Sequence, residues 1–137
     1  MTTVSDPPLV RRDLTDPVTQ GFYLLRVGFT VAPILAGLDK FTNWMVDWST
    51  YLWPGVASAL PGSPDQIMLV VGVVEIAAGI LVALRPRIGG YVVAAWLAGI
   101  IVDLLLLGDH HDVALRDLGL LLGALTLARL ADAVRRR

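Results

Sequence analysis

A single carboxylate in a long apolar stretch places the strongest constraint on this chain. Glu75 lies near the middle of the run from Met68 to Leu84, in which all the remaining residues are apolar or glycine. In a membrane-spanning helix, a charge at that depth costs about 2.5–3.5 kcal/mol on insertion scales. The fold must therefore give Glu75 a partner, a proton or a water-filled cavity.

The composition predicts a small integral membrane protein without a separate soluble domain. Of 137 residues, 55% are hydrophobic and only 17% are charged, and the charges are clumped between apolar runs of membrane-spanning length. There is no cysteine, which excludes disulfides, iron–sulfur ligation by cysteine and c-type haem attachment. No basic run is long enough to indicate a nucleic-acid partner.

We predict an all-α fold, a four-transmembrane-helix up-down bundle, within a membrane domain over residues 18–131. The predicted spans cover about 18–38, 66–84, 88–107 and 113–130, between a flexible cytoplasmic tail (1–17) and a basic tail (132–137). A cleaved signal peptide is the competing interpretation of the first span, but Arg26 interrupts its apolar run and no clear cleavage site follows. Pro33 should kink this span locally, and Ser63 or Asp65 should cap the second.

Two helix faces carry small and polar residues, which in membranes normally face other helices. In the second span this face contains Gly72, Glu75 and Gly79. The corresponding face of the first span recurs at helical spacing and consists of Arg26, Thr30, Pro33, Gly37 and Lys40.

The connection between the first two spans is rich in aromatic residues. Trp44, Trp48 and Tyr51 are predicted to share one helical face, and Trp53 follows. The pattern is typical of an interfacial helix lying among lipid headgroups. A lid, or a quinone-contacting surface over the mouth of the bundle, is the alternative.

The distribution of Lys and Arg predicts the orientation. Positive charge is concentrated in the N-terminal tail, in the loop from Arg85 to Arg87 and at the C-terminus, whereas the aromatic connection and the loop 109–112 have almost none. The chain should therefore cross the inner (plasma) membrane with both termini in the cytoplasm.

This topology places Arg26 and Glu75 at similar depths and predicts an ion pair between them. Such a pair would fix the bundle and keep Glu75 ionised. The alternative is that Glu75 is a titrating group for proton or quinone chemistry. A second tier of polar residues is expected near the outer end, beneath the aromatic connection: Asp39, Lys40, Asp103, Arg116 and Asp117.

Residues 109–112, Asp-His-His-Asp, allow two interpretations. A metal site is one. The other is a polar turn in which Asp112 caps the fourth span. Adjacent histidine side chains diverge and so short a connection offers little scaffold, so no metal site is predicted.

Four short segments resemble the DoxX-like family of small four-span bacterial membrane proteins. They are Leu25-Arg26-Val27-Gly28, Gly37-Leu38-Asp39-Lys40, residues 72–79 around Glu75, and Arg116-Asp117-Leu118. The resemblance extends over residues 18–130 and implies a four-helix membrane bundle. It also implies candidate functional positions at Arg26, Lys40, Glu75 and Asp117. Some members are membrane subunits of oxidoreductase systems, including thiosulfate:quinone oxidoreductase and oxidative-stress complexes.

The leading hypothesis is an accessory membrane subunit of a redox or respiratory complex, with a quinone or lipid site between its helices. A purely structural scaffold or anchor is the alternative, and a small transporter or channel ranks third. The chain has no recognisable cofactor-binding motif, so catalysis by the chain alone is not expected. If it is redox-linked, it is a membrane subunit of a quinone-linked oxidoreductase. The expected partners are the lipid bilayer and other membrane subunits.

Overall fold

A computed structural model describes residues 15–45 and 47–136, with the side chains of residues 135 and 136 excepted. This part of the chain contains helices and no strand: α1 (Pro17–Thr42), η1 (Trp48–Tyr51), α2 (Pro54–Ala59), α3 (Pro64–Leu84), α4 (Pro86–Leu107) and α5 (His111–Arg136). Residues 1–14 of the predicted flexible tail lie outside the described residues. Part of the predicted basic tail continues α5.

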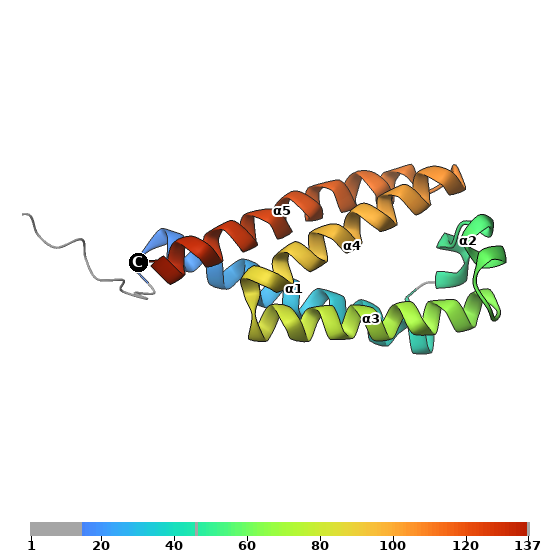
Figure 1. Ribbon diagram of the computed structural model, residues 1–137, viewed down its shortest axis with the longest axis horizontal. Coiled ribbons are helices and arrows are strands. Elements are labelled where there is room, and N and C mark those ends of the chain that lie inside the picture. Colours follow the sequence, from blue (N-terminus) through green and yellow to red (C-terminus); the bar gives the residue numbers. More distant parts are fainter. Residues whose placement is uncertain (1–14, 46, 137) are drawn as a thin grey trace, which may run out of the picture.

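The four long helices run alternately in opposite directions (Figure 1). One end of the assembly, here called the basal end, contains Pro17, the α3–α4 turn and Arg136. The opposite, apical end contains η1, α2 and the α4–α5 turn. Figure 1 shows that α1 and α5 extend beyond the α3–α4 turn at the basal end, so that this turn is recessed.

Helix α1 is longer at both ends than its predicted span. Asp16 caps its start by accepting a hydrogen bond from the Val18 N–H, and Pro17 occupies the first turn, where its missing N–H costs nothing. The helix continues through Pro33 and ends where Asn43 adopts a left-handed conformation with φ 50°. The resulting 26 residues make a helix about 39 Å long.

Glycines bring α1 and α3 into backbone contact. A Cβ atom on Gly37 would lie 2.5 Å from the carbonyl oxygen of Gly72, and one on Gly79 would lie 2.7 Å from that of Thr30. Only residues without a side chain fit at these crossings. The predicted small and polar faces of the first two spans do pack against each other.

Helix α3 starts with a capping box. The Ser63 hydroxyl accepts from the Gln66 N–H, and the Gln66 side chain accepts from the Ser63 N–H. Of the two residues predicted as possible caps, Ser63 and Asp65, Ser63 is the one that caps this helix, and Asp65 lies in its first turn.

A second close pair is formed by α4 and α5. A Cβ atom on Gly90 would lie 2.9 Å from the Ala124 carbonyl oxygen. Buried apolar residues fill the space between both pairs of helices, mostly toward the basal end, and include Phe22, Val82, Val93, Leu97, Leu127 and Val134.

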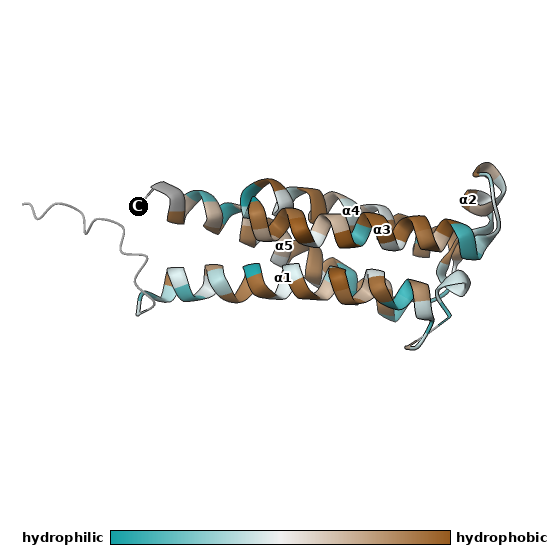
Figure 2. Cartoon of the chain, turned by 90° about the horizontal axis from the view of Figure 1, so that it is seen from below, coloured by the Kyte–Doolittle hydropathy of each residue, from teal (hydrophilic) through white to brown (hydrophobic). Residues whose placement is uncertain are grey.

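Three helices, α1, α3 and α4, are long and apolar enough to cross a membrane. Figure 2 shows hydrophobic residues along the long helices, and many large ones are exposed, such as Leu24 at 75% and Leu84 at 70%. An exposed apolar surface of this extent requires a nonaqueous environment or a partner. The membrane character predicted from composition is therefore supported.

Candidate functional site

Lys40 and Glu75 form an ion pair in the interior of the apical half. Lys40 Nζ donates to Glu75 Oε2 over 2.8 Å, and the two side chains are 4% and 9% exposed. A buried charge without a partner is strongly unfavourable. Lys40 is therefore the partner that the position of Glu75 in an apolar run requires. It joins the end of α1 to the middle of α3.

The predicted pair of Arg26 and Glu75 is wrong. The antiparallel register set by Gly37 and Gly72 places Arg26 beside Ala83, whose carbonyl oxygen accepts a hydrogen bond from the Arg26 guanidinium. Ala83 is eight residues from Glu75 along α3, or about 12 Å. The prediction assumed that both spans begin at the same level, whereas α1 starts well beyond the α3–α4 turn.

The direction of the side chains also decides between Lys40 and Arg26. On a helix, each Cα–Cβ bond tilts toward the N-terminus. Glu75 on α3 therefore leans toward the apical end, and Lys40 on the antiparallel α1 leans toward the basal end, so the two side chains converge. Arg26 also leans toward the basal end, away from Glu75. The guanidinium lies instead 5.9 Å from the centre of the Phe22 ring.

Asp39, next to Lys40, holds the aromatic connection in place. Its Oδ2 atom accepts from Trp48 Nε1 over 2.6 Å, and its Oδ1 atom accepts from the Met45 N–H over 3.0 Å. The Thr42 hydroxyl donates to the same carboxylate over 3.4 Å. These bonds fold the chain back over the end of α1.

Trp48 covers the ion pair. Lys40 Nζ lies 3.7 Å from the centre of the Trp48 ring, which is a favourable cation–π position. Tyr51 lies against Trp48 with a centroid separation of 5.7 Å and against His110 at 4.1 Å. Together Trp48, Tyr51 and His110 form what we call the aromatic roof.

The segment that follows the roof residues Trp48 and Tyr51 is also bonded to α4. The Trp53 N–H donates to Asp103 Oδ1 over 2.9 Å. Asp103, which was predicted to belong to the outer polar tier, therefore accepts a hydrogen bond from a backbone amide.

The predicted aromatic face of Trp44, Trp48 and Tyr51 is wrong in part. The left-handed Asn43 ends α1, and helical structure resumes only in the short 3₁₀ helix η1. Trp44 is separated from the roof and is 85% exposed. Only Trp48 and Tyr51 contact each other.

On α5, Asp117 is buried, with 5% of its side chain exposed. Arg116 Nη2 donates to Asp117 Oδ1 over 3.2 Å, and the Arg116 side chain is 63% exposed. Asp117 also interacts electrostatically with Lys40. The structure thus brings Lys40, Glu75, Arg116 and Asp117 to one region and leaves Arg26 apart from it.

Asp112 does not cap α5, which the polar-turn interpretation of the Asp-His-His-Asp segment had predicted. The helix begins at His111, so that Asp112 lies inside its first turn, and His110 adopts a positive φ of 59°. Within residues 15–45 and 47–136, no group of three or more His, Cys, Asp or Glu side chains could hold a metal ion.

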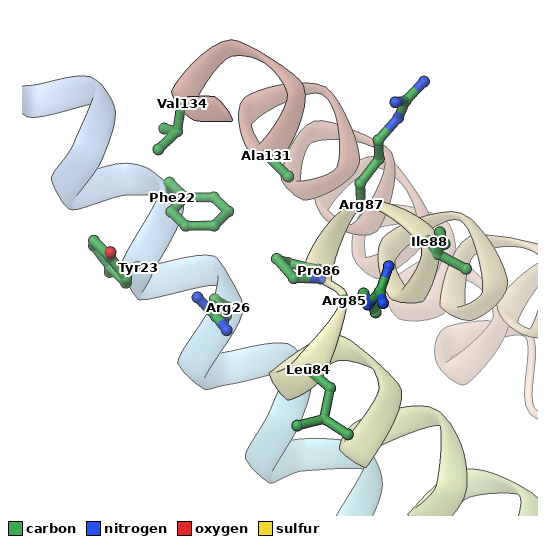
Figure 3. A pocket seen from close by; sticks show the side chains of 10 residues that line it. All are labelled: Phe22, Tyr23, Arg26, Leu84, Arg85, Pro86, Arg87, Ile88, Ala131 and Val134. Atoms are coloured by element: carbon green, nitrogen blue, oxygen red, sulfur yellow. The ribbon is translucent and has the colours of Figure 1, made fainter. Parts of the chain in front are cut away.

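Two cavities lie toward the basal end. The larger, about 580 Å³, is lined by residues from α1, the α3–α4 turn and α5, among them Arg26, Arg85 and Arg87. Figure 3 shows Phe22 and Arg26 of α1 facing Pro86 across it, with Ala131 and Val134 on the α5 side. A second cavity of about 340 Å³ follows α1 past Val27 and Val31. Neither cavity is lined by Lys40 or Glu75.

The role of Asp39 in the roof was missed by the sequence-based prediction. A signal for it exists, because an acidic residue in the last turn of a helix opposes the helix dipole. An aspartate there needs hydrogen-bond donors of its own. The aromatic residues that follow it supply the indole N–H.

The polar side chains at the apical end, here called the apical cluster (Asp39, Lys40, Glu75, Arg116 and Asp117), are suited to holding helices together. Its four buried polar side chains, Asp39, Lys40, Glu75 and Asp117, all have partners within the chain. Lys40 and Trp48, the groups best suited to donate to a quinone carbonyl, are already bonded to carboxylates.

No protein-family model, curated protein or solved structure matches this chain. The resemblance to the DoxX-like family stays a prediction based on its four short segments.

Proposed function

We propose that the chain is a four-span accessory subunit of a redox or respiratory complex in the inner (plasma) membrane. In this proposal both termini are cytoplasmic, and η1 and α2 lie at the outer interface. The DoxX-like resemblance suggests the redox association. The observation that carries the accessory role is the Lys40–Glu75 pair, which lies buried beneath the aromatic roof.

The fourth span of the proposal is α5, which is more charged than the other three long helices. Its charges are placed compatibly with a membrane. Asp117 and Asp132 are buried, and Arg116 and Arg129 lie toward opposite ends of the helix. Between them, Leu118 and Leu122 are exposed and can face lipid.

The arrangement of the apical cluster favours a structural role over catalysis or transport. A polar path for ions needs groups that exchange partners with the transported ion, and catalysis needs a reacting group accessible to substrate. Lys40 and Glu75 are instead closed in by protein. The basal cavity is the candidate for an interhelical quinone or lipid site.

Purification in mild detergent tests this proposal. Co-purifying proteins are identified by mass spectrometry, and quinone is measured after lipid extraction. Recovery of oxidoreductase subunits in a stable complex supports the accessory role. A stable complex without redox subunits or quinone contradicts the accessory redox role and favours a scaffold. A protein that purifies alone and without quinone contradicts both the redox role and the scaffold.

A second experiment tests whether Glu75 acts in proton chemistry. We expect Glu75→Gln to leave the pH dependence of the host complex unchanged once the subunit has assembled. A pH profile that changes in assembled Glu75→Gln complexes contradicts a structural role.

The absence of cysteine allows a direct test of sidedness. Single cysteines at Ser58 in α2 and at Ala133 in α5 lie at opposite ends of the molecule. A membrane-impermeant maleimide should label the Ser58 variant in intact spheroplasts, and the Ala133 variant only after lysis. The reverse pattern overturns the proposed orientation.

A further inference from the structure

We propose that the larger basal cavity binds the phosphate group of an anionic phospholipid, whose acyl chain lies in the neighbouring cavity along α1. This inference rests on the proposed membrane location and names the ligand class of the interhelical site. It uses none of the apical residues.

The recessed α3–α4 turn creates the cavity. Helices α1 and α5 each have 26 residues, whereas α3 has 21 and α4 has 22. Both longer helices continue past the turn (Figure 1). The turn therefore leaves a space of about 580 Å³ between them, which is within the usual size range of small-molecule sites.

Three arginines contribute to the lining of this space, although Figure 3 shows the Arg87 side chain directed away from Phe22 and Arg26. Its ten lining residues include Arg26, Arg85 and Arg87 and no acidic residue. Arg87 is partly engaged, because its Nη1 atom lies 3.6 Å from Asp132 Oδ1. Among the residues that the structure describes, no carboxylate forms an ion pair with Arg26 or Arg85. Two guanidinium groups are thus available to an anion.

Arg26 is held in place for this role. One amino group donates to the Ala83 carbonyl oxygen, and the guanidinium lies over the Phe22 ring. An arginine has five N–H donors, so most of them stay available. A planar guanidinium suits bidentate contact with phosphate oxygens.

The second cavity distinguishes a lipid from a free anion. It shares Tyr23 and Arg26 with the larger cavity and continues along α1 between Val27, Val31 and Ala83. Val27 is 61% exposed and Val31 is 46% exposed, so this side is open. The larger cavity, lined by arginines, is joined to the second cavity, which is apolar and open. This pair of cavities matches a phospholipid, with its charged headgroup and attached acyl chain. A neutral quinone has a tail but offers no charge to the arginines.

Native mass spectrometry of the purified protein in neutral detergent tests the proposal, with dioctanoyl phosphatidylglycerol titrated against dioctanoyl phosphatidylcholine. We expect tighter binding of phosphatidylglycerol. Loss of one charge-assisted hydrogen bond should weaken its binding about tenfold or more in Arg26→Gln and in Arg85→Gln. Because Arg85 is exposed, its variant should fold even if Arg26→Gln does not.

Arg129→Gln is the matched control. Arg129 is an exposed arginine of α5 toward the same end, and it does not line the cavity. Its replacement should leave the preference for phosphatidylglycerol unchanged. An equal loss in Arg129→Gln would show general surface attraction and overturn the site.

Three other outcomes also overturn the inference. Equal binding of both lipids excludes headgroup selectivity. Equally tight binding of inorganic phosphate shows a free-anion site, and tighter binding of a short-chain ubiquinone shows a quinone site. Release of the protein from membranes by alkaline carbonate would instead contradict the proposed function. A membrane-retained protein without lipid selectivity contradicts only the inference.

Discussion

Lys40 and Glu75 are 35 residues apart in the sequence and 2.8 Å apart in the structure, where they join α1 to α3. The removal of two charges from water costs about as much as their attraction returns, so a buried pair adds little net stability. It does make other arrangements of the two helices unfavourable, because any of them would leave a buried charge alone. We interpret the pair as a lock on the register of α1 against α3.

Breaking this pair from one side should therefore cost more than removing it. We expect Lys40→Met to lower the free energy of unfolding by about 3–5 kcal/mol, since Glu75 is left buried without its counter-ion. The double variant Lys40→Met with Glu75→Leu should recover most of that loss. Reversible unfolding in mixed micelles, followed by circular dichroism, measures both. Losses that simply add in the double variant would contradict the lock.

Trp48 allows the indole hydrogen bond to be separated from the ring. Trp48→Phe keeps an aromatic ring near Lys40 but removes the N–H that Asp39 accepts. We expect a loss of about 1–3 kcal/mol in unfolding free energy, together with faster hydrogen exchange in residues 48–52. Trp44→Phe is the control, because Trp44 is 85% exposed. If the two variants behave alike, the Asp39 bond does not hold the roof.

Much of the helical arrangement could be predicted from the sequence, because periodicity and small residues report directly on packing. The face through Arg26, Gly37 and Lys40 was expected to meet another helix, and it packs on α3. The pairing of α1 with α3 could be predicted for the same reason, since Gly72 and Gly79 permit backbone contact.

The partners of individual charges could not be predicted, because they depend on the register between helices. Span limits drawn from hydropathy placed Arg26 and Glu75 at one level. The glycine contact between Gly37 and Gly72 sets a different level, at which Lys40 reaches Glu75. The aromatic roof could not be predicted from the sequence for a related reason. Its shape follows from the left-handed Asn43 and from hydrogen bonds to Asp39, and not from the periodicity of the sequence.

Close packing at Gly37 predicts a large effect from a small substitution. In Gly37→Ala, the added methyl would lie 2.5 Å from the Gly72 carbonyl oxygen and 2.7 Å from an Ile76 side-chain carbon. The α1–α3 contact must open, at a typical cost of about 1–3 kcal/mol. We expect a matching decrease in unfolding free energy in mixed micelles.

Gly28→Ala, in the same helix, is the matched control. Apart from its chain neighbours and the nearby backbone of α1 itself, no heavy atom lies within 4 Å of a Cβ placed on Gly28. There alanine should be neutral, or stabilising by up to about 1 kcal/mol through its higher helix propensity. Equal destabilisation by both substitutions would mean that backbone flexibility of α1 matters more than its contact with α3.

Asp103 offers the last test, because its partner is a backbone N–H and so requires an acceptor but not a charge. Asp103→Asn keeps a side-chain oxygen for the Trp53 amide, whereas Asp103→Leu removes it. We expect exchange of the Trp53 amide to quicken about tenfold or more in Asp103→Leu, since a bond to a charged group contributes about 1.5–3 kcal/mol. Asp103→Asn should show a smaller increase. Equal exchange in both variants would mean that the carboxylate acts through its charge, and an unchanged rate in Asp103→Leu would mean that the roof is held without α4.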